Sequence, residues 1–149
     1  MGLLEAVRAV TPKARVVVTS SLAAVGTCTG GVATETSPLH PISRYGASKA
    51  RMEAALAPFS DLALTVVRPP AVYGPREADI FTFFKTLSRG LCPIVGDPDV
   101  PALTLVHVRD LVAGMLRAAD APEAVGQTYF LGSPRDYSWG EIRDAAAQE

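Results

Sequence analysis

Residues 15–21 read RVVVTSS, and residues 44–49 read RYGASK. The first segment is a run of β-branched side chains ending in hydroxyl residues, which favours a strand covered on both faces. The second segment is rich in helix-forming residues, and Ser43 just before it is a residue type preferred at helix N-termini. The sequence therefore predicts a buried strand, a glycine-containing loop and then a helix.

Helical and strand-like patterns alternate along the rest of the chain. We expect helices at 2–10, 43–57, 79–89 (ended by Gly90) and 110–119, and from Ser138 onward, where Ser138 and Glu141 have capping-box spacing. We expect strands at 15–19, 62–67, 104–108 and 128–131. Alternation of this kind is typical of α/β folds with a mainly parallel sheet.

Composition restricts the classes of function. The chain has 149 residues, 48% of them hydrophobic, and a formal net charge of −1. This length and composition suit one globular domain with a real core. The near balance of charges gives no electrostatic footprint for nucleic acid or an anionic membrane, so we expect neither as a partner.

Targeting signals and cysteine usage favour a cytoplasmic protein. The longest apolar stretches are strand-sized, which predicts no membrane association, and no basic segment precedes an apolar one as in a signal peptide. The two cysteines, Cys28 and Cys92, indicate neither a disulfide framework nor a metal cluster.

Tyr45, Lys49 and Ser21 are the candidate catalytic residues. A helix brings positions i and i+4 to one face, so Lys49 is expected one turn from Tyr45. An ammonium at that position stabilises a phenolate and makes a tyrosine useful for proton transfer. Ser21 follows a parallel strand, where α/β sheets bind ligands, and its hydroxyl can bond the same substrate oxygen. Alone, the Tyr/Lys pair is equally typical of a solvated helix face.

The order of several segments resolves this ambiguity. The segments VVVTSS (16–21), RYGASK (44–49), VRPPAVYGP (67–75) and LVHVRD (105–110) together resemble the extended short-chain dehydrogenase/reductases, which include NAD-dependent epimerases and dehydratases. The resemblance covers nearly the whole chain. It implies an α/β fold with a partial Rossmann-type, doubly wound parallel sheet and a small C-terminal substrate-lobe portion. It also implies a single truncated domain, with a catalytic portion at about 1–76 and a substrate-lobe portion at about 77–149.

The resemblance also implies a role for each matching residue, with NAD or NADP as cofactor. Tyr45 would be the general acid/base, Lys49 would bind the nicotinamide ribose and tune Tyr45, and Ser21 would orient the substrate oxygen. The cofactor side would be lined by Thr19 and by the backbone from Pro69 to Val72, and a substrate contact is implied for Arg76.

Two departures from the family pattern affect these expectations. The family's Gly-x-x-Gly-x-x-Gly turn, which cradles pyrophosphate, is not in this sequence, and Gly26, Gly30 and Gly31 have the wrong spacing. We therefore expect about four strands of the usual sheet to be missing and cofactor binding by the chain alone to be weak. Ala71 stands where nucleotide-sugar enzymes usually carry Asn, which favours a smaller or more apolar alcohol or ketone.

The leading hypothesis is an NAD(P)-dependent oxidoreductase or epimerase acting on an alcohol or ketone, sugar-like or sterol-like, through a Ser-Tyr-Lys set. Whether the outcome is redox, epimerisation or dehydration stays open. The alternative is a non-catalytic remnant or assembly module, because loss of neighbouring strands would leave strand 15–19 with an unpaired edge that favours self-association.

Other notable residues receive structural interpretations. We expect His107 to be a packed or capping histidine, and Asp110 to cap the helix that follows. Phe81, Phe83 and Phe84 are expected to pack in the core or the substrate lobe.

Overall fold

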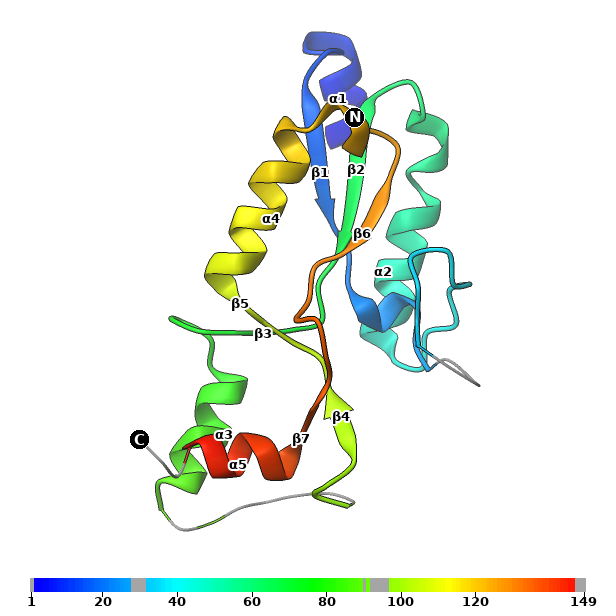
Figure 1. The fold of residues 1–149 in the computed structure, drawn as a ribbon. Coiled ribbons are helices and arrows are strands. Elements are labelled where there is room, and N and C mark those ends of the chain that lie inside the picture. Colours follow the sequence, from blue (N-terminus) through cyan, green and yellow to red (C-terminus); the bar gives the residue numbers. More distant parts are fainter. Residues whose placement is uncertain (1, 28–31, 90, 92–96, 147–149) are drawn as a thin grey trace. The chain divides into compact units, whose positions relative to one another are not determined.

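The computed structural model describes residues 2–27, 32–89, 91 and 97–146 (Figure 1). The chain divides into two compact units, each built from two separate segments. The first unit comprises Met1–Pro70 and Val112–Leu131, and the second comprises Ala71–Leu111 and Gly132–Glu149. The sequence-based inferences for Cys28, Gly30, Gly31, Gly90 and Cys92 lie outside the described residues.

The first unit contains a parallel sheet of β1 (Arg15–Thr19), β2 (Ala63–Arg68) and β6 (Thr128–Phe130), in the order β1-β2-β6. Val17 of β1 lies opposite Thr65 of β2, and Val66 of β2 lies opposite Thr128 of β6. This sheet of parallel strands confirms the predicted α/β, Rossmann-type architecture.

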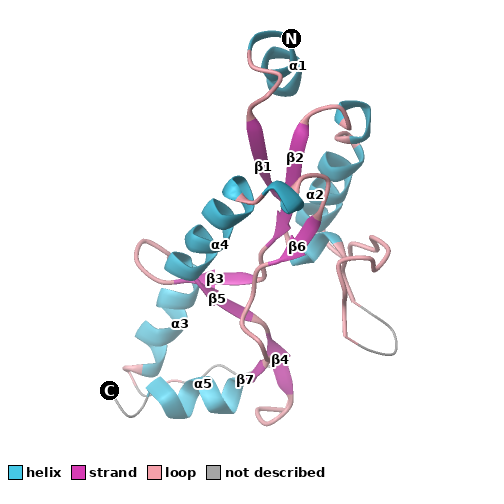
Figure 2. Ribbon diagram, turned by 45° about the horizontal axis from the view of Figure 1, so that its top comes forward, coloured by secondary structure: helices cyan, strands magenta, loops and turns pink. Residues whose placement is uncertain are grey.

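Helices lie on both sides of this sheet. In Figures 1 and 2, α2 (Arg44–Ala54) and the part of α4 (Val108–Asp120) that belongs to the first unit flank the strands from opposite sides. The unit also contains α1 (Leu3–Val10) and the short 3-10 helices η1 (Leu22–Ala24), η2 (Ala57–Phe59) and η3 (Pro122–Ala124).

The core of the first unit is centred on β2 rather than β1. Leu64 and Val67 of β2 are buried, as are Ala24 and Val25 beside η1. In β1 the three valines are only half-buried, so the expectation of a strand covered on both faces is wrong for the described residues. The reason is position, because β1 lies at the end of the strand order and β2 lies in its middle.

The second unit combines two small sheets with two helices. A parallel pair joins β3 (Ala71–Tyr73) to β5 (Leu105–His107), and an antiparallel pair joins β4 (Pro101–Leu103) to β7 (Tyr137–Ser138). The helices α3 (Asp79–Leu87) and α5 (Trp139–Ala146) lie side by side in Figures 1 and 2. The ring of Phe83 on α3 packs 4.9 Å, centroid to centroid, from that of Trp139 on α5.

Several element boundaries differ from those expected. Helix α2 ends at Ala54 and α3 at Leu87, both earlier than predicted, whereas α4 begins earlier, at Val108. His107 precedes α4, and its Nδ1 accepts a hydrogen bond from the backbone N–H of Arg109 at 3.3 Å, which agrees with the capping interpretation. Asp110 therefore lies within the first turn of α4 and does not cap it.

The chain passes between the two units at three points, after Pro70, Leu111 and Leu131. Strand pairing is the physical reason, since β6 returns to the sheet beside β2. The division near residue 76 into catalytic and substrate-lobe portions stays a prediction. Among the described residues, no helix is long and apolar enough to span a bilayer, and no three or more His, Cys, Asp or Glu side chains are grouped so that they could hold a metal ion.

Candidate active site

Lys49 and Tyr45 meet at the carboxyl end of β1. The Lys49 Nζ donates a hydrogen bond of 2.9 Å to the backbone carbonyl of Thr19, the last residue of that strand. The same Nζ lies 5.7 Å from the centroid of the Tyr45 ring. The expected one-turn spacing on a single helix face is thus observed, and the ammonium is anchored to the strand rather than free in solvent.

The start of α2 is held in place by two local features. The Ser43 hydroxyl caps the helix by accepting a 3.0 Å hydrogen bond from the Gly46 N–H, as the sequence predicted. Gly46 is buried against η1, and a Cβ added there would lie 2.1 Å from the carbonyl oxygen of Ala23. Only glycine permits this approach, which brings the helix that carries Tyr45 against η1.

Ser21 lies directly before η1, in the segment against which α2 packs. It caps η1, and its Oγ accepts a 3.2 Å hydrogen bond from the Ala23 N–H. This arrangement leaves the hydroxyl proton as a donor for another oxygen. Ser21 is 9% exposed whereas Tyr45 is 58% exposed, so the serine is buried and the phenol is open to solvent.

The predicted cofactor-side residues fall in different units. Pro69 is buried in the first unit, where its carbonyl accepts a 2.9 Å hydrogen bond from the Leu22 N–H. Thr19 is exposed at the tip of β1. Val72, in contrast, belongs to β3 of the second unit, where it pairs with Val106. Arg76 also belongs to the second unit and has a positive φ of 74°.

A buried ionic network behind the Tyr/Lys pair was not predicted from the sequence. The Arg68 guanidinium binds the Glu53 carboxylate through both oxygens, with Nε–Oε1 at 3.0 Å and Nη2–Oε2 at 2.7 Å. The Ser20 hydroxyl donates to the same carboxylate. The side chains of Arg68 and Glu53 are only 6% and 10% exposed. This network fastens α2 to the ends of β1 and β2.

The charge state of Glu53 follows from two opposing effects. Burial acts to raise its pKa, but hydrogen bonds from Arg68 and Ser20 and the positive charge of Arg68 outweigh burial, so the pKa lies below its ordinary value of 4.5. Glu53 is therefore a carboxylate at neutral pH. The sequence did contain a signal for this residue: Glu53 lies one helical turn after Lys49, so both are expected on the same face of the helix.

The network extends to the loop that precedes α2. The Nη1 of Arg68 donates a 3.1 Å hydrogen bond to the Glu35 carbonyl. The Glu35 carboxylate in turn accepts a 3.2 Å hydrogen bond from the N–H of Phe130 in β6. Arg68 thus joins three parts of the first unit: the helix, the loop and the sheet.

The second unit contains a cavity of about 1010 Å³. Aromatic and aliphatic side chains from α3, α5, β4 and β5 dominate its lining, notably Phe83, Phe84, Leu103, Leu105, Trp139 and Ile142. Ala71 also lines it. The predicted packing role fits the half-buried Phe83. Phe84 lines the cavity but is 37% exposed, and Phe81 is 62% exposed and lines a smaller adjoining hollow with Arg76.

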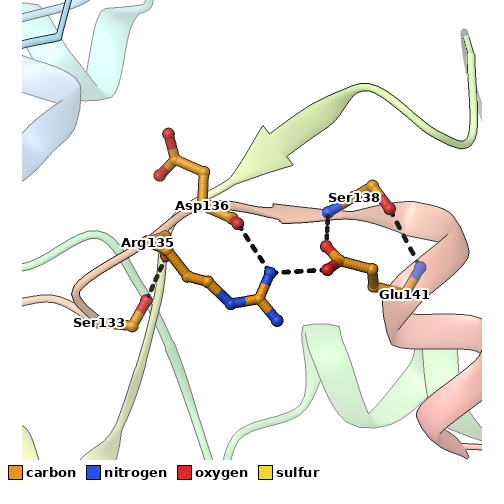
Figure 3. A network of polar contacts seen from close by, with 5 residues as sticks. All are labelled: Ser133, Arg135, Asp136, Ser138 and Glu141. Carbon is orange, nitrogen blue, oxygen red and sulfur yellow. Dashed lines mark hydrogen bonds and ion pairs between the residues drawn. The ribbon is translucent and has the colours of Figure 1, made fainter.

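A polar network borders this cavity and is drawn in Figure 3. Ser138 and Glu141 form the predicted capping box at the start of α5, with Ser138 N–Glu141 Oε2 at 2.8 Å and Glu141 N–Ser138 Oγ at 3.1 Å. The Arg135 Nη1 donates to the other Glu141 oxygen at 2.6 Å. The pKa of Glu141 lies below its ordinary value, mainly because its carboxylate accepts the hydrogen bond from the Ser138 N–H and, to a smaller extent, that from Arg135.

The first unit matches part of what a nicotinamide cofactor needs. The Lys49 ammonium supplies donors of the kind that bind ribose hydroxyls, and Thr19 offers a hydroxyl at the strand tip where α/β sheets bind ligands. The donor set therefore fits the nicotinamide end of the cofactor. The sequence contains no glycine-rich turn of the spacing that binds pyrophosphate.

The parallel sheet with helices on both sides defines the class of protein, an α/β domain of Rossmann-type architecture. The family model described as "NAD dependent epimerase/dehydratase family" matches residues 1–132. The chain belongs to this family.

Similar proteins agree with this assignment. The chain is 35% identical over 114 residues to the uncharacterized protein y4nL of Sinorhizobium fredii. This match covers 73% of the chain and 32% of that protein. It is 32% identical over 108 residues to a ceramide reductase of Caulobacter vibrioides, covering 71% and 33% respectively. The chain thus spans about a third of the length of these curated relatives.

A solved structure extends the similarity over nearly the whole chain. The dTDP-glucose 4,6-dehydratase of Bacillus anthracis, in complex with NAD, superposes with a TM-score of 0.83 at 25% identity. The match covers 98% of this chain and 49% of the dehydratase. The chain therefore corresponds to about half of that structure.

Proposed function

We propose that this chain carries the proton-transfer residues of an NAD(P)-dependent oxidoreductase or epimerase that acts on an alcohol or ketone. The observation that carries this proposal is the anchoring of Lys49 to the tip of β1, with its ammonium 5.7 Å from the Tyr45 ring. Membership of the NAD-dependent epimerase/dehydratase family and similarity to an NAD-bound dehydratase support it.

Tyr45 is the proposed general acid/base. In the oxidising direction the Tyr45 phenolate takes the proton from the substrate hydroxyl, and in the reducing direction the phenol returns it. Lys49 stabilises the phenolate by its positive charge, and the bond to the Thr19 carbonyl keeps the ammonium close to the phenol. Bound NAD(P) supplies hydride exchange at the carbinol carbon.

Ser21 is the proposed donor to the substrate oxygen. Its hydroxyl already accepts from the Ala23 N–H, so the remaining proton can be donated. Burial of Ser21 reduces competition from water. The proposed cofactor contacts are Lys49 at the ribose and Thr19, Pro69 and Val72 along the nicotinamide side.

Replacing Tyr45 tests the proposal. NAD(P)H turnover with an alcohol or ketone would be measured for the chain alone and with the preceding half of a family member supplied as a second chain. We expect Tyr45→Phe to lower kcat by about 100-fold or more, the usual contribution of a general acid/base. Tyr129→Phe, a matched change in β6, should have little effect. Turnover that survives Tyr45→Phe unchanged contradicts the proposed mechanism.

One observation favours the alternative of an assembly module. Within the described residues, β1 pairs with β2 only, which leaves its other edge without a strand. Unpaired strand edges promote association with other chains. If this edge is used, the chain forms oligomers whose mass rises with concentration, as light scattering would detect. A single monomeric species up to high concentration argues against this alternative.

A further inference from the structure

The cavity of the second unit is chemically distinct from the polar edge that carries Tyr45 and Lys49. Its volume of about 1010 Å³ lies at the upper end of the range for small-molecule sites, about 300–1,000 Å³. Rings and aliphatic chains make up most of its lining. The tilted ring pair Phe83–Trp139 forms part of the wall between α3 and α5. Such a lining gains most from a ligand that brings apolar surface.

The charges at this cavity disfavour a phosphorylated ligand. Among the described residues that line it, the single guanidinium, Arg135, is bonded to Glu141 at 2.6 Å. Asp110 adds a further carboxylate, so the ionised lining residues sum to one negative charge. A diphosphate would enter against this charge, and Arg135 could bind it only by giving up its bond to Glu141.

The cavity nevertheless has polar groups for one end of a ligand. The Nδ1 of His107 accepts a hydrogen bond from the Arg109 N–H, which leaves Nε2 as the ring's donor. His107 and Tyr73 both line the cavity, and their rings meet edge to face with centroids 5.2 Å apart. A single carbonyl or hydroxyl oxygen would be satisfied by such a donor.

We propose that the cavity of the second unit binds an uncharged, largely apolar ligand that carries a single carbonyl or hydroxyl oxygen. All the residues that line this cavity belong to the second unit, so the inference stands independently of the function proposed for Tyr45. It assigns specificity to the apolar wall of Phe83, Trp139 and Ile142, and it excludes nucleoside diphosphate sugars as preferred ligands of this cavity.

Trp139 provides a direct readout, because it is the sole tryptophan of the sequence and lines the cavity. Its fluorescence would be titrated in the 149-residue chain, without cofactor, using 2-undecanone, 4-phenylbutan-2-one and UDP-glucose. We expect saturable changes with both ketones, with Kd values of about 10–500 µM, as the affinity of small apolar ligands allows. UDP-glucose should bind at least about tenfold more weakly.

Two phenylalanines on α3 offer a matched pair of variants. Phe83→Ala removes a ring from the cavity wall and should weaken ketone binding by at least about fivefold. Phe81→Ala removes the same ring from a side chain that is 62% exposed and should leave the Kd unchanged. If the circular dichroism spectrum shows that Phe83→Ala does not fold, Ile142→Ala serves as the second cavity variant.

The titration separates this inference from the proposed function. Tighter binding of UDP-glucose than of both ketones, or no saturation by either ketone, overturns the assignment of the cavity. Equal effects of Phe83→Ala and Phe81→Ala overturn it as well. Failure of the catalytic proposal looks different: ketones bind at Trp139 while Tyr45→Phe leaves turnover unchanged.

Discussion

Arg68→Met tests the buried network that fastens α2 to the sheet. The variant removes two hydrogen bonds to Glu53, at 3.0 and 2.7 Å, and one to the Glu35 carbonyl at 3.1 Å. It leaves the Glu53 carboxylate with a side chain that is only 10% exposed and without its positive partner. Breaking one side of a buried pair costs about 3–5 kcal/mol.

Urea denaturation followed by far-ultraviolet circular dichroism would measure this loss. With an m-value of about 2 kcal/mol/M, a loss of 3–5 kcal/mol lowers the urea midpoint by roughly 1.5–2.5 M. The double variant Arg68→Met/Glu53→Gln removes the stranded charge and should recover part of the loss. Arg8→Met is the matched control, because Arg8 and Asp61 form an exposed pair in which little stability is expected.

The pH dependence of Arg68→Met gives a second, independent check. In the native protein the pKa of Glu53 is lowered, so its contribution to stability is present above the unfolded value, near 4.5, and is lost as pH falls through the folded value. Without Arg68, burial dominates and favours the protonated form. The stability difference between the two proteins should therefore be largest at pH 7. It should narrow first as pH falls through the raised pKa of Glu53 in the variant, and then further below about pH 4.5 as Glu53 of the native protein is protonated.

Two results would refute this reasoning. One is a difference that stays constant from pH 7 to pH 4, since a stranded carboxylate must respond to protonation. The other is a loss no larger than that of the surface control Arg8→Met. Either result would mean that the Arg68–Glu53 pair is solvated in solution.

Three further predictions concern packing, capping and cofactor affinity. Gly46→Ala should cost at least about 3 kcal/mol in thermal or urea unfolding, because its Cβ would meet the Ala23 carbonyl, whereas Gly2→Ala, where only the Glu5 carboxylate approaches, at 3.9 Å, should be tolerated. Ser138→Ala should lower the free energy of unfolding by about 1 kcal/mol through loss of the α5 cap, which a lower urea midpoint followed by Trp139 fluorescence would report. Calorimetry with NADH should detect weak binding or none to the 149-residue chain, because these residues contain no glycine-rich pyrophosphate turn; micromolar affinity would contradict this.

Periodicity and end signals predicted the main helices and the sheet strands of the first unit. The strand at residues 15–19 matches β1 in both bounds, and the helix caps at Ser43 and Ser138 are as expected. These features depend on local chemistry: β-branched runs, hydroxyl caps and a glutamate three residues beyond a cap. Local signals of this kind are visible in a single sequence.

The features that the sequence did not reveal depend on distant partners. The strands β3, β4 and β7 contain only two or three residues, and each exists because of the strand that pairs with it. The contact between Glu53 and Arg68 requires α2 and β2 to be placed together first. The apolar cavity likewise forms only when α3 and α5 pack, although Phe83 and Trp139 are each visible as aromatic residues.

The candidate site was foreseen in part. The resemblance pointed to Tyr45, Lys49 and Ser21, and the structure places Lys49 beside Tyr45 and at the end of β1. It gave no reason to single out Ser20, whose hydroxyl binds Glu53 while its neighbour Ser21 caps η1. Successive side chains at a strand end point in opposite directions, so two adjacent serines have two different tasks.

The return of β6 to the sheet has a consequence for biosynthesis. β6 pairs with β2 through Val66 and Thr128, and the whole first segment of the second unit, Ala71–Leu111, lies between them in the chain. On the ribosome, therefore, the three-stranded sheet cannot close until Phe130, the last residue of β6, has emerged. Until then one edge of β2 lacks its neighbouring strand, and unpaired strand edges are where nascent chains associate wrongly.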